Sequence, residues 1–128
     1  MRDGVKVILI NKEKKFLLNL RDRDHHENPH YWSLIGGGID EGETPNEAIV
    51  RETKEEISYD LKDFEKIYEE DIPNVGKRIF YLAKSDVPIS ELVLGEGEDL
   101  KYFTYEEIKD LKVNPLHRKV LKLALTHI

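Results

Sequence analysis

Residues 37–59, GGIDEGETPNEAIVRETKEEISY, carry the strongest helix signal in the chain and decide its fold. Thr44 is suited to cap the start of a helix, Pro45 to take its first position, and Glu47 to complete a capping box of the S/T-x-x-E type. We therefore expect a helix that runs from Pro45 to about Ile57.

The predicted helix has a core face and an acidic face. The core face carries side chains at four-residue spacing: Ile49, Thr53 and Ile57. On a neighbouring arc, Glu52, Glu55 and Glu56 stand three and four residues apart, and each like-charge pair should cost about a few tenths of a kcal/mol. A divalent cation would offset this repulsion, because Mg²⁺ is held in proteins by a few carboxylates together with substrate phosphates and water.

The composition of the chain is that of one soluble globular domain. Its 128 residues are 39% hydrophobic and 36% charged, which favours a single folded domain over residues 1–128. There is no cysteine, which excludes a disulfide framework, a thiolate metal site and a cysteine nucleophile. The N-terminal stretch has only about five consecutive apolar residues, too few for a signal peptide or a membrane span, so we expect a cytoplasmic protein.

The net charge of −6 limits the class of partner. No positive field attracts a nucleic-acid polymer, and we expect none as a partner. A small phosphorylated ligand is compatible with this charge if a cation mediates its binding.

The order of predicted elements points to an α/β domain. Apolar runs and turn signals predict strands, the first two forming a hairpin, at residues 5–10, 15–20, 60–71, 77–85 and 100–103. Helices are predicted over 104–111, where a second capping box occurs, and over 114–128. Residues 87–99 are ambiguous and are interpreted as a strand end followed by a glycine-rich acidic loop. We expect a mixed β-sheet with a helix on each face.

The segment 37–59 resembles the Nudix box, G-x5-E-x7-R-E-U-x-E-E-x-G-U, where U is a bulky apolar residue. Gly37 matches the opening glycine and Glu43 the first glutamate, and the two charged pairs are Arg51–Glu52 and Glu55–Glu56. The resemblance extends over nearly the whole chain and implies the Nudix fold, an α/β/α sandwich with a mixed sheet.

Four positions depart from the family pattern. Ser58 stands where the family has glycine, Tyr59 where it has a smaller aliphatic residue, Thr53 at an often apolar position, and Ile35 where proline usually precedes the glycines. Ser58 should make the helix end costlier, because a left-handed residue there favours glycine. No charged position of the box is lost, so we expect activity to be retained.

The resemblance implies a role for each matching residue. Glu52, Glu55 and Glu56 would bind Mg²⁺ or Mn²⁺, with the backbone carbonyl of Gly37, or of Gly38, as a further ligand. Small MutT-like members carry another acidic residue in a later loop, and that match is Glu96, with Glu98 as the alternative. Glu43 and Arg51 would form the structural pair that orients the helix glutamates.

The implied reaction is hydrolysis of the diphosphate linkage in a nucleoside diphosphate derivative. Glu55, Glu56 and Glu96 are candidates for the general base, and the sequence does not rank them. The short chain favours a MutT-like reaction on a (d)NTP, with an ADP-ribose or nucleotide-sugar pyrophosphatase as the alternative. A non-catalytic nucleotide sensor would be expected to lack a helix glutamate, and all are present. A monomer and a homodimer both remain open.

Four further residues are candidates for binding the substrate. Arg21 and Arg23 follow the second predicted strand and are suited to bidentate contacts with phosphate oxygens. Phe80 and Tyr81 alternate on a predicted strand, so that one should face the core, and we take Tyr81 as the ring that stacks on a base. The resemblance suggests Asn114 as a contact to a base edge, although Asn-Pro is also a common helix start.

Overall fold

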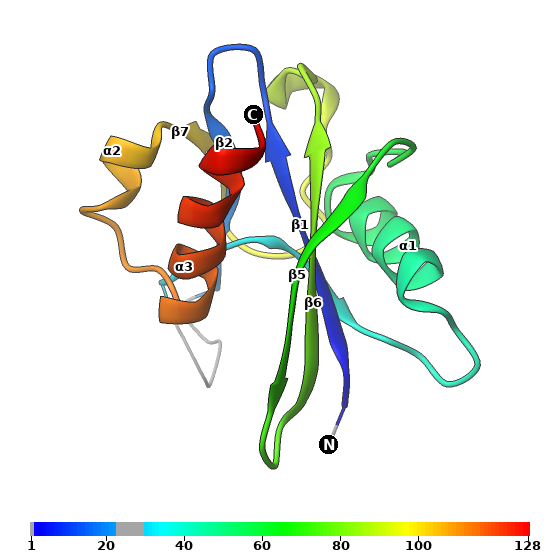
Figure 1. The fold of residues 1–128 in the computed structure, drawn as a ribbon. Helices are drawn as coiled ribbons and strands as arrows, with labels where there is room; N and C mark the ends of the chain where they lie inside the picture. The colour runs from blue at the N-terminus through cyan, green and yellow to red at the C-terminus, as the bar shows by residue number, and fades with distance from the viewer. Residues whose placement is uncertain (1, 23–29) are drawn as a thin grey trace.

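The computed structural model describes residues 2–22 and 30–128, which form a sheet with helices on both sides (Figure 1). The strands are β1 Gly4–Ile10, β2 Phe16–Leu20, β3 Trp32–Ser33, β4 Ile35–Gly38, β5 Glu65–Ile72, β6 Gly76–Lys84 and β7 Asp99–Phe103. The helices are α1 Pro45–Ile57, α2 Tyr105–Ile108 and α3 Pro115–Ala124, and short 3₁₀ turns cover Ile89–Glu91 and Leu125–His127.

The sheet is mixed and has seven strands, in the order β3-β2-β1-β6-β5, with β4 also paired to β1 and β7 to β2. β1 and β6 run parallel, and the other pairs are antiparallel. Along one edge, β1 pairs with β4 from Gly4 to Val7 but with β2 only at Ile10. Because β1 changes partner along its length, β2 and β4 separate, and the candidate site lies where they do so.

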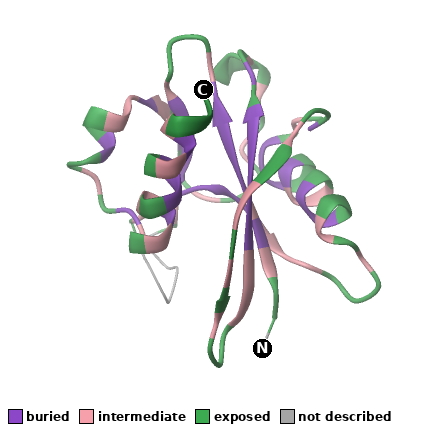
Figure 2. Cartoon of the chain, in the orientation of Figure 1, coloured by how far each residue is buried: buried purple, intermediate pink, exposed green. Residues whose placement is uncertain are grey.

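Each face of the sheet has its own hydrophobic core. Val5, Val7 and Leu9 pack toward α1, whereas Ile8 and Ile10 pack toward α3. Figure 2 shows the central strands as largely buried, since helices cover both faces. Burial on both faces explains why β1 is an almost unbroken apolar run. The predicted α/β/α architecture is confirmed.

Several predictions about single elements can be compared with the structure. α1 has the predicted bounds, and the capping box between Thr44 and Glu47 is formed. Ser58 ends this helix in the left-handed conformation, with φ of 58°. The predicted strand at 60–71 begins later, at Glu65, and the glycines before the acidic helix belong to β4. Residues 87–99 contain a 3₁₀ turn and only the first residue of β7, so the suggestion of a strand end was wrong.

Among the described residues, no helix is long and apolar enough to cross a membrane.

Candidate functional site

Arg51 binds several of the acidic side chains on and near α1. Its guanidinium binds both carboxylate oxygens of Glu43, with Nε–Oε2 at 2.7 Å and Nη2–Oε1 at 2.9 Å. Nη2 also donates to the carbonyl of Gly38 at 3.0 Å, while Nη1 donates to Glu52 and to Glu55, both at 3.1 Å. The hydrogen bonds from Arg51 lower the pKa of Glu43 to about 2. The helix is thereby tied to the end of β4.

Glu56 is the buried carboxylate of the cluster, with only 7% of its surface exposed. Its Oε1 accepts a hydrogen bond from Asn19 Nδ2 at 3.0 Å, and its Oε2 accepts one from the backbone N–H of Gly36 at 2.8 Å. Burial raises its pKa to about 7, even though both hydrogen bonds favour the charged form. Burial of the Glu56 carboxylate therefore costs free energy of folding, and two hydrogen bonds hold this carboxylate in a fixed orientation.

Lys6 contacts the other side of the same strand, β4. Its Nζ donates to the carbonyl of Gly36 at 3.1 Å and to that of Leu34 at 3.3 Å. Burial lowers the pKa of Lys6, and the nearby carboxylate of Glu56 opposes that shift. The peptide groups of Gly36 thus lie between an ammonium group and a carboxylate.

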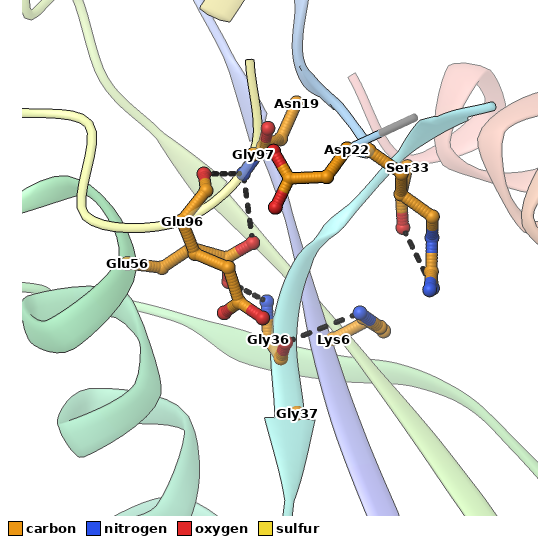
Figure 3. Close-up of a pocket in the computed structure, with 10 residues that line it drawn as sticks. Lys6, Asn19, Asp22, Ser33, Gly36, Gly37, Glu56, Glu96 and Gly97 are labelled. Carbon is orange, nitrogen blue, oxygen red and sulfur yellow. Dashed lines mark hydrogen bonds between the residues drawn. The ribbon is translucent and has the colours of Figure 1, made fainter. Parts of the chain in front are cut away.

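The loop before β7 brings Glu96 to Glu56 (Figure 3). Gly95 N–H donates to the carbonyl of Glu56 at 2.8 Å, and Asn19 Nδ2 donates to that of Glu96 at 2.9 Å. A cavity of about 210 Å³ opens here, and Glu96, not the alternative Glu98, lines it. Its walls are Lys6, Asn19, Arg21, Asp22, Ser33, Gly36, Gly37, Glu56, Glu96 and Gly97.

Gly97 is required by the geometry of this loop. Its φ is +90°, and a Cβ there would lie 2.1 Å from Asn19 Oδ1 and 2.7 Å from the carbonyl oxygen of Leu20. Asn19 is 3% exposed and holds both Glu56 and the loop, so any side chain at position 97 would displace it.

A second, larger cavity of about 640 Å³ adjoins the first and shares Lys6, Arg21 and Gly37 with it. Arg21 also lies 3.4 Å from the hydroxyl of Ser33 through Nη2. Asn114 lines the larger cavity and at the same time caps α3, accepting from Leu116 N–H at 2.8 Å. Arg21 and Asn114, which were both predicted to bind the substrate, therefore border the cavities.

The other two predicted substrate-binding residues are Tyr81 and Arg23. Tyr81 is 3% exposed and packs toward α1, where its hydroxyl donates to Asn46 Oδ1 at 2.8 Å. Phe80, the preceding residue on β6, faces the opposite side and lines the larger cavity. Tyr81 borders neither of these two cavities, and Phe80, which lines the larger one, is itself only 1% exposed. Arg23 lies outside the described residues.

The donor set suits a hard divalent cation, because it consists of carboxylate oxygens. Glu52 lies against the backbone of Gly37, close enough that a Cβ on this glycine would be 2.6 Å from the carboxylate. Within residues 2–22 and 30–128, however, no three acidic or histidine side chains are already gathered for a metal ion. Glu52 and Glu55 each have one carboxylate oxygen hydrogen-bonded to Arg51, which leaves the second oxygen of each for a cation.

Lys6 and Asn19 were not singled out from the sequence. Each is the one polar residue inside an apolar strand segment, VKVILI at residues 5–10 and FLLNL at residues 16–20. A lone polar residue on a strand that is buried on both faces needs a buried partner, and this is the signal that would have found them.

Comparison with known proteins places these observations in context. A sequence model described as the NUDIX domain matches residues 1–124. A Nudix hydrolase of Listeria monocytogenes is 31% identical over 117 residues, and the match covers 84% of this chain but 66% of that relative's length. An RNA pyrophosphohydrolase of Nitratiruptor is 34% identical over 114 residues, covering 73% of this chain and 74% of the relative.

A solved structure has a similar fold. The MutT structure described for Aliivibrio salmonicida and Vibrio cholerae superposes with a TM-score of 0.81 at 20% identity, over 99% of this chain and all of that one.

Proposed function

The chain belongs to the Nudix family, and on this premise we propose that it is a cation-dependent pyrophosphohydrolase that cleaves the diphosphate linkage of a nucleoside diphosphate derivative. The observation that carries the proposal is Glu56. A buried carboxylate with a raised pKa is costly, and here it is oriented at both oxygens beside Glu96, in a cavity that also holds Arg21 and Lys6. Such a combination is typical of a functional site.

Glu52, Glu55, Glu56 and Glu96 would hold Mg²⁺ or Mn²⁺, with the carbonyl of Gly37 as a further ligand. When bound, the cation neutralises phosphate oxygens and lowers the pKa of a coordinated water.

The other residues around the cavity position these ligands or face the phosphates. Asn19 and Gly36 fix the direction of the Glu56 carboxylate. Arg21 and Lys6 border the same cavity with N–H groups suited to phosphate oxygens.

The general base is Glu55 or Glu96 in this proposal. Both oxygens of Glu56 already accept a hydrogen bond, which leaves this carboxylate poorly placed to take a proton from water. Glu55 is 60% exposed and has one oxygen bound to Arg51, so its other oxygen is available to a water molecule.

The first substrate class is a (d)NTP, cleaved in a MutT-like reaction. The fold, which matches a MutT structure over the whole length of that chain, is compatible with this class. ADP-ribose and nucleotide sugars are the second class, and simple nucleotide sensing is the third. A small nucleotide is the partner in all three.

The test is a substrate panel read out as phosphate release with a coupling phosphatase or pyrophosphatase. It comprises the dNTPs, oxidised dGTP, ADP-ribose, nucleotide sugars and dinucleoside polyphosphates, each with Mg²⁺, with Mn²⁺ and with EDTA. We expect one class to be turned over with either cation and none with EDTA. Binding of a nucleotide without turnover of any compound would favour the sensor and overturn the proposal.

A further inference from the structure

The larger cavity differs in charge from the rest of the protein. The whole chain has a net charge of −6, yet among the described residues four basic ones and one acidic one line this cavity. The basic residues are Arg2, Lys6, Arg21 and Arg78, and the acidic one is Asp3. The carboxylate of Asp3 already accepts a hydrogen bond from the backbone N–H of Lys77 at 2.8 Å. The cavity is therefore positively charged.

Two of these cations form no ion pair within the part of the chain that the structure describes. Arg78 donates through Nη1 to the carbonyls of Arg2, at 2.7 Å, and of Lys77, at 3.1 Å. Lys6 likewise donates only to carbonyls. Arg2, in contrast, is paired with Asp40 at 2.7 Å. Lys6 and Arg78 are thus held in place by backbone oxygens, with no carboxylate bound directly to either.

The neutral polar groups of this cavity are also donors. Asn114 uses its side-chain oxygen to cap α3, which leaves its N–H₂ group for a ligand. His117 accepts from Leu34 N–H through Nδ1 at 3.5 Å, and burial lowers its pKa, so the neutral ring carries its proton on Nε2. A wall of donors and cations matches a ligand that is rich in anionic acceptor oxygens.

The larger cavity adjoins the smaller one but is not lined by Glu56 or Glu96. In Figure 1, the lower ends of β1, β5 and β6 run past the end of α3, and Arg78 is the third residue of β6, paired with Gly4 at the start of β1. The smaller cavity, with Glu56 and Glu96, is where a diphosphate and its cation would bind. A nucleotide that reaches from the smaller cavity into the larger one therefore meets two further cations, Arg2 and Arg78.

We propose that the larger cavity binds a phosphate monoester of the substrate that lies outside the cleaved diphosphate, held by Arg78 together with the side chains of Asn114 and His117. This inference deepens the proposed function and rests on it for the identity of the ligand as a substrate. It narrows the substrate class to nucleotides that carry a further phosphate on the nucleoside or on the group joined to it.

The test measures binding of compounds that contain no diphosphate linkage. Calorimetry in the presence of Mg²⁺ compares 5′-AMP with adenosine 2′,5′-bisphosphate and adenosine 3′,5′-bisphosphate. We expect at least one bisphosphate to bind about tenfold more tightly than 5′-AMP, because the added phosphate gains charge-assisted hydrogen bonds. None of the three compounds can be cleaved at a diphosphate, so the result does not depend on whether the protein is a hydrolase.

Three variants locate the effect. Arg78→Gln should reduce the preference for the bisphosphate to less than about threefold, and Arg78→Lys, which keeps the charge, should retain most of it. Lys77→Gln is the matched control, because the adjacent Lys77 is paired with Glu69 at 3.5 Å and does not line this cavity. It should leave the preference unchanged.

Two outcomes would overturn the inference. Equal affinity of the wild-type protein for 5′-AMP and both bisphosphates, or no binding of any of them, would show that the cavity has no site for a second phosphate. If Arg78→Gln weakens the mono- and bisphosphates by the same factor, Arg78 contacts the 5′-phosphate common to all three.

Discussion

Replacing Glu56 by glutamine should stabilise the cation-free protein at alkaline pH. In the folded chain the pKa of Glu56 rises from 4.5 to about 7. At about 1.4 kcal/mol for each unit of pKa, burying the charged carboxylate therefore lowers the free energy of unfolding by about 3 kcal/mol, a penalty that depends on pH. Because the folded pKa lies above the unfolded one, the penalty is absent below about pH 4.5 and complete above about pH 7. Glutamine has no charge to bury and escapes this penalty.

The gain is reduced by one lost hydrogen bond. In the Glu56→Gln variant the amide oxygen can still accept from Gly36 N–H, but the amide N–H₂ group would then face Asn19 Nδ2, which is also a donor. Losing that contact costs about 1 kcal/mol. Glu56→Gln should therefore raise the free energy of unfolding by about 2 kcal/mol at pH 8 and leave it nearly unchanged at pH 5.

Urea denaturation in EDTA at the two pH values measures this difference directly. Glu65→Gln is the control, since Glu65 is exposed and a change there should stay within about 0.5 kcal/mol. Destabilisation by Glu56→Gln at pH 8, or the same gain at pH 5 and pH 8, would refute the reasoning that Glu56 is a carboxylate kept at a cost to folding.

Three other substitutions test local features of the site. Ser58→Gly relieves a left-handed residue with φ of 58°, and it should stabilise the chain by up to about 1 kcal/mol, seen as a higher melting temperature in calorimetry; a lower one would contradict this. Arg51→Lys loses the two-pronged contact with Glu43 and should weaken Mn²⁺ binding by about 10- to 100-fold in an EPR titration, whereas unchanged affinity would show that the contact does not orient the ligands. Gly97→Ala places a Cβ 2.1 Å from Asn19 Oδ1 and should cost about 1–3 kcal/mol in urea denaturation, and a loss below about 0.5 kcal/mol would mean that the loop adapts.

The features that the sequence predicted well are determined locally. α1 begins and ends as expected because Thr44, Pro45 and Glu47 act within one turn, and Ser58 takes the left-handed conformation that glycine usually fills. The contact between Arg51 and Glu43 also joins residues that are close in sequence. Local capping chemistry was enough to predict the bounds of α1, and the spacing of the Nudix box was enough to predict the contact between Arg51 and Glu43.

The features that were missed depend on how distant strands meet. Lys6 and Asn19 are lone polar residues in apolar strands, but their partners are determined only where β2 and β4 separate along β1. The sequence likewise did not show that Phe80, and not Tyr81, lines the larger cavity. Both faces of β6 are covered by apolar cores, so alternation alone does not tell which ring faces the ligand side.

The central claim is that the carboxylates around Glu56 hold the cation that the hydrolysis requires. The most direct measurement is the rate at which the wild-type protein, Glu56→Gln and Glu65→Gln release phosphate from the panel substrates at pH 8 with Mg²⁺. We predict that Glu56→Gln remains folded and is at least about 100-fold slower, while Glu65→Gln matches the wild type. A Glu56→Gln protein that cleaves its substrate at the wild-type rate would contradict the claim.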